Sequence, residues 1–144
     1  MSKPTTKEIQ AALLDAAQQA RENSYSPYSH FKVGAAVFTR QGHIFTGTNI
    51  ENASYGLTVC AERNATFAAV GAGEKDIVAL ALVTQKLPGA QVNSPCGACR
   101  QVMLEMEDRY QRPLRVLLYG TEGIYVIRSV KDLLPLTFVD ADMH

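Results

Sequence analysis

All three cysteines of this 144-residue chain lie in two short motifs, one of which also holds a glutamate. Residues 60–62 read Cys-Ala-Glu, and residues 95–99 read Pro-Cys-Gly-Ala-Cys. Three protein ligands leave the fourth position of a tetrahedral zinc ion open for water, as in catalytic zinc sites. The spacing therefore predicts that one Zn²⁺ per subunit is bound by the three cysteines, with the glutamate as proton carrier, in the set Cys60, Cys96, Cys99 and Glu62.

Both cysteine groups are expected at the N-termini of helices. The segment 60–70 is alanine-rich and begins with Cys60, and the segment 96–108 carries Cys96 and Cys99 in its first turn. Helix N-termini have unpaired N–H groups and partial positive charge, which lower the pKa of a thiol and favour the thiolate that binds metal.

The charge of such a ligand set needs compensation. Three thiolates around Zn²⁺ leave a net charge of about −1, which weakens the ion as a Lewis acid. A hydrolytic site must lower the pKa of bound water to about 7. Arg63, next to Glu62, is expected to donate to a thiolate sulfur and offset this charge.

Two other interpretations of the cysteines remain open. Cys96 and Cys99 could form a redox dithiol, because a Cys-x-x-Cys pair alone does not distinguish the two chemistries. A structural zinc would need a fourth ligand, which His30, His43 or His144 could supply, although none has the spacing of a zinc finger. Either alternative would make the chain a non-catalytic zinc or redox module.

The elements that position these motifs alternate along the chain. Thr5 and Glu8 have the spacing of a capping box ahead of a helix that ends near residue 22. Strands are predicted at 32–39, 43–49, 77–84, 114–119 and 124–128, and the tail 130–144 is expected to hold about one helical turn. Gly34 and Gly47 can be explained as glycines at strand bends. A hairpin followed by alternating helices and strands implies an α/β or α+β layered domain.

Composition narrows the class of protein. With 47% hydrophobic and 19% charged residues, the chain fits one globular domain spanning 1–144. Fourteen basic residues balance fourteen acidic ones without a basic stripe, so no nucleic-acid partner is expected. The absence of a signal-peptide pattern and the short apolar runs indicate no membrane association. An odd number of cysteines also suits metal binding in the reducing cytoplasm.

The two motifs together match the signature of the zinc deaminases, with cysteine at the first position. The chain resembles the cytidine deaminase family, in its homotetrameric, three-cysteine zinc type. The similarity covers most of the length and is carried by residues 26–36, 48–55, 60–63, 94–102 and 133–135.

The resemblance implies a three-layer α-β-α sandwich with a mixed five-stranded sheet. It also implies a homotetramer with active sites at subunit interfaces, where Tyr55 and Phe138 help to build a neighbouring subunit's pocket. The implied activity is zinc-dependent hydrolysis of cytidine and 2'-deoxycytidine to uridine and 2'-deoxyuridine with release of ammonia, in pyrimidine salvage. The alternative is a zinc deaminase acting on another aminopyrimidine nucleoside or a nucleoside antibiotic.

Further site residues follow from the same resemblance. Phe31 is expected to pack against the pyrimidine, and Asn49 and Glu51 to hydrogen-bond a ribose hydroxyl. Ala61 is expected to offer its backbone N–H to the base. Activated water would attack C4 while Glu62 protonates N3 and then the departing amine.

Overall fold

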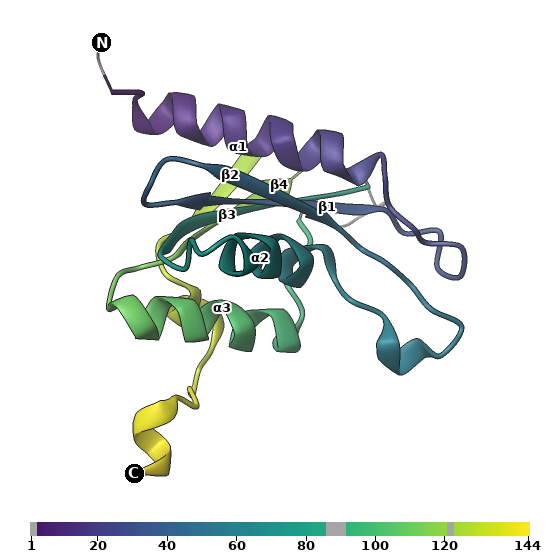
Figure 1. Ribbon diagram of the computed structural model, residues 1–144. Coiled ribbons are helices and arrows are strands. Elements are labelled where there is room, and N and C mark those ends of the chain that lie inside the picture. The colour runs from purple at the N-terminus through teal and green to yellow at the C-terminus, as the bar shows by residue number, and fades with distance from the viewer. Residues whose placement is uncertain (1–2, 86–91, 121–122) are drawn as a thin grey trace.

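A mixed five-stranded sheet runs through the middle of the computed structural model, which describes residues 3–85, 92–120 and 123–144 (Figure 1). The strands lie in the order β2-β1-β3-β4-β5; β3 and β4 are parallel, and the other neighbours are antiparallel. This confirms the predicted α/β class and mixed sheet. The strand bounds are β1 Val33–Thr39, β2 Ile44–Thr48, β3 Ile77–Thr84, β4 Arg115–Gly120 and β5 Gly123–Ile127.

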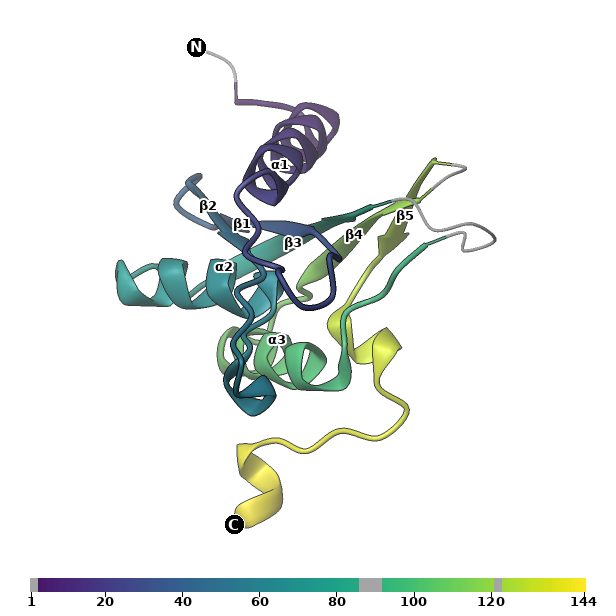
Figure 2. The same ribbon diagram turned by 90° about the vertical axis from the view of Figure 1, so that its right-hand side faces the viewer.

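Helices cover both faces of this sheet (Figure 2). Helix α1 (Thr6–Arg21) lies on one face, and α2 (Ala61–Gly71) with α3 (Gly97–Tyr110) on the other. The buried residues accordingly form two clusters, one centred on Leu13 beneath α1 and the other including Met103 of α3. These are the three layers that the family resemblance implies.

The first helix begins where its capping residue predicts. The hydroxyl of Thr5 accepts a hydrogen bond from the backbone N–H of Glu8 at 3.1 Å. Leu13, Leu14 and Ala17 are buried against the sheet. These contacts fix α1 across β1 and β3 and leave β4 less covered.

Glycines let two helices approach the sheet closely. A Cβ on Gly34 would lie 2.0 Å from the carbonyl oxygen of Ala17, and one on Gly47 would lie 2.3 Å from the backbone nitrogen of Ala65. Neither glycine has a positive φ, and close packing of α1 and α2 gives each of them a specific structural reason. The backbone of α2, which follows Cys60, therefore rests directly on β2.

Three short 3-10 turns complete the described structure: η1 (Tyr55–Leu57), η2 (Val130–Leu133) and η3 (Asp140–Met143). The tail thus holds two helical turns where one was expected. Its start is fixed by Glu107, a buried carboxylate of α3 that accepts hydrogen bonds from the Ser129 hydroxyl at 2.8 Å and from the N–H of Leu114 at 2.8 Å. Among the helices that the structure describes, none is both long enough and apolar enough to cross a membrane.

Candidate metal centre and active site

The three cysteine sulfurs converge at the N-termini of α2 and α3. Cys60 and Cys96 are the N-cap residues of these helices, and Cys99 lies in the first turn of α3. Neither N-cap thiol is used to cap its helix, and all three cysteines are free. Their sulfurs lie within 4.8 Å of one another. The fold therefore brings together the two motifs that are 36 positions apart in the chain.

The sulfur spacing fits a tetrahedral zinc ion. Ligands at the usual Zn–S distance of about 2.3 Å are about 3.8 Å apart at tetrahedral angles. The Sγ atoms of Cys60 and Cys96 are 3.8 Å apart, and those of Cys96 and Cys99 are 3.5 Å apart. Within the part of the chain that the structure describes, no histidine joins this group, which leaves a fourth position free of a protein ligand.

The thiols of Cys60 and Cys99 shift each other's pKa in opposite directions. A hydrogen bond from Cys99, with further contributions from Arg63 and Cys96, lowers the pKa of the Cys60 thiol to about 5 against the opposing effect of burial. The pKa of Cys99 is raised, first by its hydrogen bond to Cys60 and then by burial. Proximity thus favours the thiolate form of Cys60 and the thiol form of Cys99, and a cation bound between the sulfurs would favour the thiolate form of both.

Arg63 supplies positive charge at the cluster. Its Nη2 donates to the Cys60 sulfur at 3.3 Å, and this hydrogen bond is the main reason that the pKa of Arg63 is raised. Its Nε is buried and lacks a hydrogen-bond partner among the described residues. An unpaired buried donor is costly, and it adds to the positive character of the surroundings of the sulfurs. The donor set and its surroundings thus fit zinc.

Glu62 lies two residues after Cys60 and is 5% exposed. Burial is the main cause of the raised pKa of its carboxyl group, with the charge of Cys60 acting in the same direction. A carboxyl group with a raised pKa beside the cysteine cluster is suited to accept and return a proton. Ala61, the first residue of α2, is fully buried, and its N–H is among those that a helix leaves without an internal partner.

Arg100, the residue after Cys99, was given no role by the sequence reasoning. Its guanidinium donates to the carbonyls of Pro95 and Leu133 and to the hydroxyl of Ser94, each at 2.7 Å. The arginine thus ties the loop before Cys96 to the C-terminal tail. A positive charge near the N-terminus of a helix is unfavourable because of the helix dipole. This position of Arg100 is the signal in the sequence from which specific hydrogen-bond partners could have been inferred.

The segment that contains Asn49 lies beside the entry to α2. Ile50 and Val59 exchange two backbone hydrogen bonds, each of 3.0 Å. Buried Asn49 accepts through Oδ1 from the N–H of Val33 at 3.0 Å, and its Nδ2 donates to the carbonyl of Phe31 at 2.7 Å. The structure therefore connects the expected ribose contact directly to the expected pyrimidine contact and to the residue before Cys60.

Glu51 fastens the loop before β1. Its Oε1 accepts from the N–H groups of Tyr28 at 2.9 Å and Ser29 at 3.1 Å, and its Oε2 accepts from the Ser29 hydroxyl. The hydroxyl hydrogen bond is the main cause that lowers the pKa of Glu51. A hollow of about 370 Å³ opens here, lined by Tyr28, Ser29, Glu51, Tyr55 and Thr58.

The aromatic residues expected around the substrate are much less enclosed. Phe31 is half-buried, whereas Tyr55 and Phe138 are 74% and 55% exposed. Tyr55 packs edge-on against Tyr28 with ring centroids 5.8 Å apart. Gln101 of α3 donates to the carbonyl of Phe138 at 2.8 Å, which holds this part of the tail against the helix that bears Cys99.

Comparison with known proteins agrees with this geometry. Residues 7–111 match the family model described as the cytidine and deoxycytidylate deaminase zinc-binding region. The cytidine deaminase of Halalkalibacterium halodurans is 47% identical over 92% of this chain and 96% of its own length. The blasticidin-S deaminase of Bacillus cereus is 32% identical over 74% of this chain and 76% of its own.

A solved structure extends the likeness to the fold. The crystal structure of cytidine deaminase from Burkholderia pseudomallei superimposes with a TM-score of 0.79 at 46% identity, covering 89% of this chain and 98% of that one. The three-cysteine cluster and the zinc-binding family model together establish Zn²⁺ as the cofactor. The matched length and identity show that this chain is a member of the cytidine and deoxycytidylate deaminase family.

Proposed function

We propose that this protein hydrolyses cytidine and 2'-deoxycytidine to uridine and 2'-deoxyuridine with release of ammonia. The observation that carries the proposal is a buried carboxyl group, Glu62, in the first turn of the helix that Cys60 caps, beside the three-cysteine cluster. The identity with relatives named cytidine deaminase supports the choice of substrate.

The proposed metal ligands are Cys60, Cys96 and Cys99. When bound, zinc supplies a Lewis acid that makes hydroxide available from water near neutral pH. Glu62 would accept the proton that this water releases and deliver it to N3 of the pyrimidine as C4 is attacked. It would then take the proton of the new C4 hydroxyl group and pass it to the departing amine, so that the carbonyl forms as the C4–N bond breaks. Arg63 offsets the thiolate charge through its 3.3 Å hydrogen bond to Cys60.

The hydrogen-bonding capacity left at Asn49 and Glu51 suits a ribose hydroxyl. One N–H of the Asn49 amide is used by the carbonyl of Phe31, which leaves a second N–H to donate. The Glu51 carboxylate accepts three hydrogen bonds, from Tyr28 and Ser29, and retains an acceptor position. We assign Asn49 as donor to the sugar hydroxyl and Glu51 as its acceptor. Phe31 packs against the base, and the N–H of Ala61 contacts it.

We propose that other subunits of an oligomer supply the remaining walls of the substrate pocket. Tyr55 and Phe138 are exposed in one chain, although large apolar rings are favoured in contact with other groups. A homotetramer, with these two residues contributing to a neighbouring active site, would cover them. We further propose one catalytic domain over residues 1–144, a cytoplasmic location and a role in pyrimidine salvage.

A second substrate class is favoured by one specific observation, the 32% identity to a blasticidin-S deaminase. An aminopyrimidine nucleoside antibiotic carries the same exocyclic amine but a different substituent on the base. The higher identity to cytidine deaminases places cytidine first.

The test is a deamination assay with the zinc-loaded enzyme. Cytidine, 2'-deoxycytidine, cytosine, deoxycytidine monophosphate and blasticidin S are compared by the absorbance change as the amine is lost, with bound zinc measured in parallel. The proposal predicts turnover of both nucleosides and little of the free base. Turnover of blasticidin S alone would favour the second class. No turnover by zinc-replete protein would refute both, and a reversible Cys96–Cys99 disulfide without zinc would indicate a redox module.

A further inference from the structure

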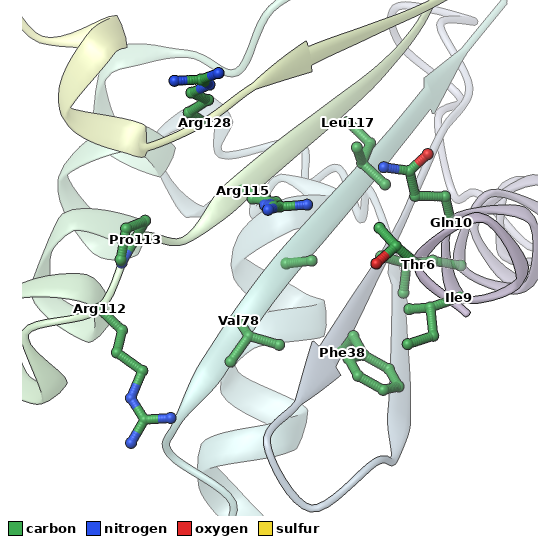
Figure 3. Close-up of a pocket in the computed structure, with 12 residues that line it drawn as sticks. Thr6, Ile9, Gln10, Phe38, Val78, Arg112, Pro113, Arg115, Leu117 and Arg128 are labelled. Carbon is green, nitrogen blue, oxygen red and sulfur yellow. The ribbon is translucent and has the colours of Figure 1, made fainter. Parts of the chain in front are cut away.

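A groove of about 600 Å³ lies on the face of the sheet that carries α1, away from the helices that bear the cysteines (Figure 3). None of its lining residues belongs to the proposed active site. The groove exists because α1 packs mainly on β1 and β3 and leaves the neighbouring surface of β4 open. It is lined by Thr6, Ile9, Gln10, Leu13, Phe38, Val78, Ala79, Arg112, Pro113, Arg115, Leu117 and Arg128.

One wall and the floor of this groove are apolar. Ile9 of α1 and the ring of Phe38 form the wall, and Val78 of β3 with Leu117 of β4 form the floor (Figure 3). Gln10, on the same side of the groove as Ile9, adds a neutral polar group. This half of the groove suits a ring or short hydrocarbon group with a hydrogen-bonding atom.

The opposite wall carries three arginines (Figure 3). Arg112 pairs with Asp76 at 3.6 Å, and Asp76 is shared with Arg40 at 3.9 Å. Among the residues that the structure describes, Arg115 and Arg128 have no carboxylate within 4.0 Å. The positive charge of this wall is thus largely unbalanced.

The register of β4 and β5 places two of these positive charges at the ends of neighbouring strands. The ladder of β4 with β5 ends at the pair Val116 and Ile127, and Arg115 and Arg128 are the next residues beyond this pair on the two neighbouring segments of the ladder. Like charges at opposite positions of an antiparallel pair are destabilising. An anion between the two guanidinium groups would remove this repulsion, and the planar donors of arginine match phosphate oxygens.

We infer that this groove binds an organic phosphate, with the phosphate group between Arg115 and Arg128 and an apolar or aromatic group against Phe38 and Ile9. A volume of about 600 Å³ is within the usual range for small-molecule sites. A polynucleotide is a poorer fit, because the chain has no net charge and the cationic wall borders an apolar recess instead of continuing as a basic stripe. The inference does not depend on the zinc chemistry.

The experiment is calorimetric titration of the zinc-loaded enzyme with phenyl phosphate, inorganic phosphate and phenol. Phenyl phosphate should bind saturably, inorganic phosphate more weakly and phenol not measurably. Arg115→Gln and Arg128→Gln should each raise the Kd for phenyl phosphate about tenfold, as expected for loss of a charge-assisted hydrogen bond. Arg109→Gln removes an exposed charge from α3 and should leave this Kd unchanged.

Thermal unfolding provides a second readout that does not require tight binding. Arg115→Gln and Arg128→Gln should keep or slightly raise Tm without ligand, because a like-charge pair is removed, and should abolish the rise in Tm caused by phenyl phosphate. No saturable binding, or equal binding by wild type and both variants, would overturn the inference. Tighter binding of a single-stranded oligonucleotide than of phenyl phosphate, abolished by the same variants, would overturn the assignment to a small ligand.

Discussion

The cysteine cluster and the aromatic residues expected around the substrate differ in how completely one chain encloses them. Cys99 is fully buried and Glu62 almost so, with Cys60 half-buried and Cys96 exposed at the edge of the cluster, whereas the rings of Tyr55 and Phe138 are mostly exposed. The reacting groups are thus assembled by α2 and α3 of a single chain. The pocket walls lack such support, and this contrast is our reason for proposing that other subunits complete them. Five experiments test the contrast, ordered by the size of the expected effect.

The largest effect is expected from Cys99→Ser, which keeps the size of the side chain but removes a thiolate ligand. Bound zinc should fall from one ion per chain to a small fraction, and deaminase activity should fall below detection. Metal analysis and the cytidine assay check this outcome. If zinc binding and subunit assembly are independent, the molecular mass of Cys99→Ser in solution should remain that of the wild type. Full zinc content with full activity would contradict the ligand assignment.

Glu62→Gln removes the proposed proton carrier while preserving the shape of the side chain. We expect zinc to be retained and the rate to fall by at least about 10²- to 10⁴-fold, the usual contribution of general acid–base catalysis. Steady-state kinetics with metal analysis of the same sample measures both quantities. Substantial residual activity in the zinc-loaded variant would show that another group moves the proton.

Arg63→Gln tests charge compensation at the edge of the cluster. Loss of its hydrogen bond to the Cys60 sulfur should weaken zinc affinity by about 10- to 100-fold, as is typical for residues that support metal ligands. Competition with a chelator measures this affinity. Arg63→Lys restores charge without the planar donor and should recover part of the loss, whereas identical affinity in all three proteins would rule out the role.

Tyr55→Ala tests the exposed aromatic residues that are proposed to contact a neighbouring subunit. Zinc content should be unchanged, while kcat/KM falls about thirtyfold if this ring is an interface hot spot that shapes a neighbour's pocket. Light scattering should show a shift towards smaller species. Tyr119, an exposed tyrosine of β4, provides the matched control, because Tyr119→Ala should change neither property. Unchanged mass and kinetics in Tyr55→Ala would remove the case for assembly through this residue.

The smallest effect concerns the loop held by Glu51. The pKa of the Glu51 carboxyl group is lowered from 4.5, first by the hydrogen bond from the Ser29 hydroxyl and then by those from the backbone N–H groups of Ser29 and Tyr28. The charged form therefore stabilises the folded state above about pH 4.5, and this contribution is lost as the pH falls through the folded-state pKa. The difference in unfolding free energy between wild type and Glu51→Gln should shrink on acidification. A difference independent of pH would show that the loop does not depend on this charge.

Local sequence signals predicted most of the fold and the metal cluster. The cap at Thr5 starts α1 as expected, and the apolar run 77–84 forms the central strand β3. The cysteine spacing correctly predicted three sulfurs at two helix N-termini. This was possible because metal-ligand motifs and helix N-termini are both recognisable from a few adjacent residues. The family resemblance then supplied the three-layer arrangement of these elements.

Contacts between distant segments could not be predicted in the same way. Gly47 looks like any strand glycine until α2 is packed against it, and Arg100 reveals its partners only when the tail reaches α3. The groove between α1 and the arginines at the ends of β4 and β5 likewise depends on how much of the sheet α1 covers. No local sequence pattern determines this coverage. Residues such as Asn49, whose hydrogen bonds cross the site, combine structural and proposed functional roles that sequence alone does not separate.

The tie between Gln101 and the Phe138 carbonyl offers a spectroscopic handle on the metal centre. The chain contains no tryptophan, so Phe138→Trp would introduce a single tryptophan, which can be excited selectively, on the segment fastened to the helix that bears Cys99. Removal and return of zinc could then be followed in real time by its emission, without a substrate present. A titration of the metal-free protein would thereby report whether the C-terminal segment responds to the occupancy of the cluster.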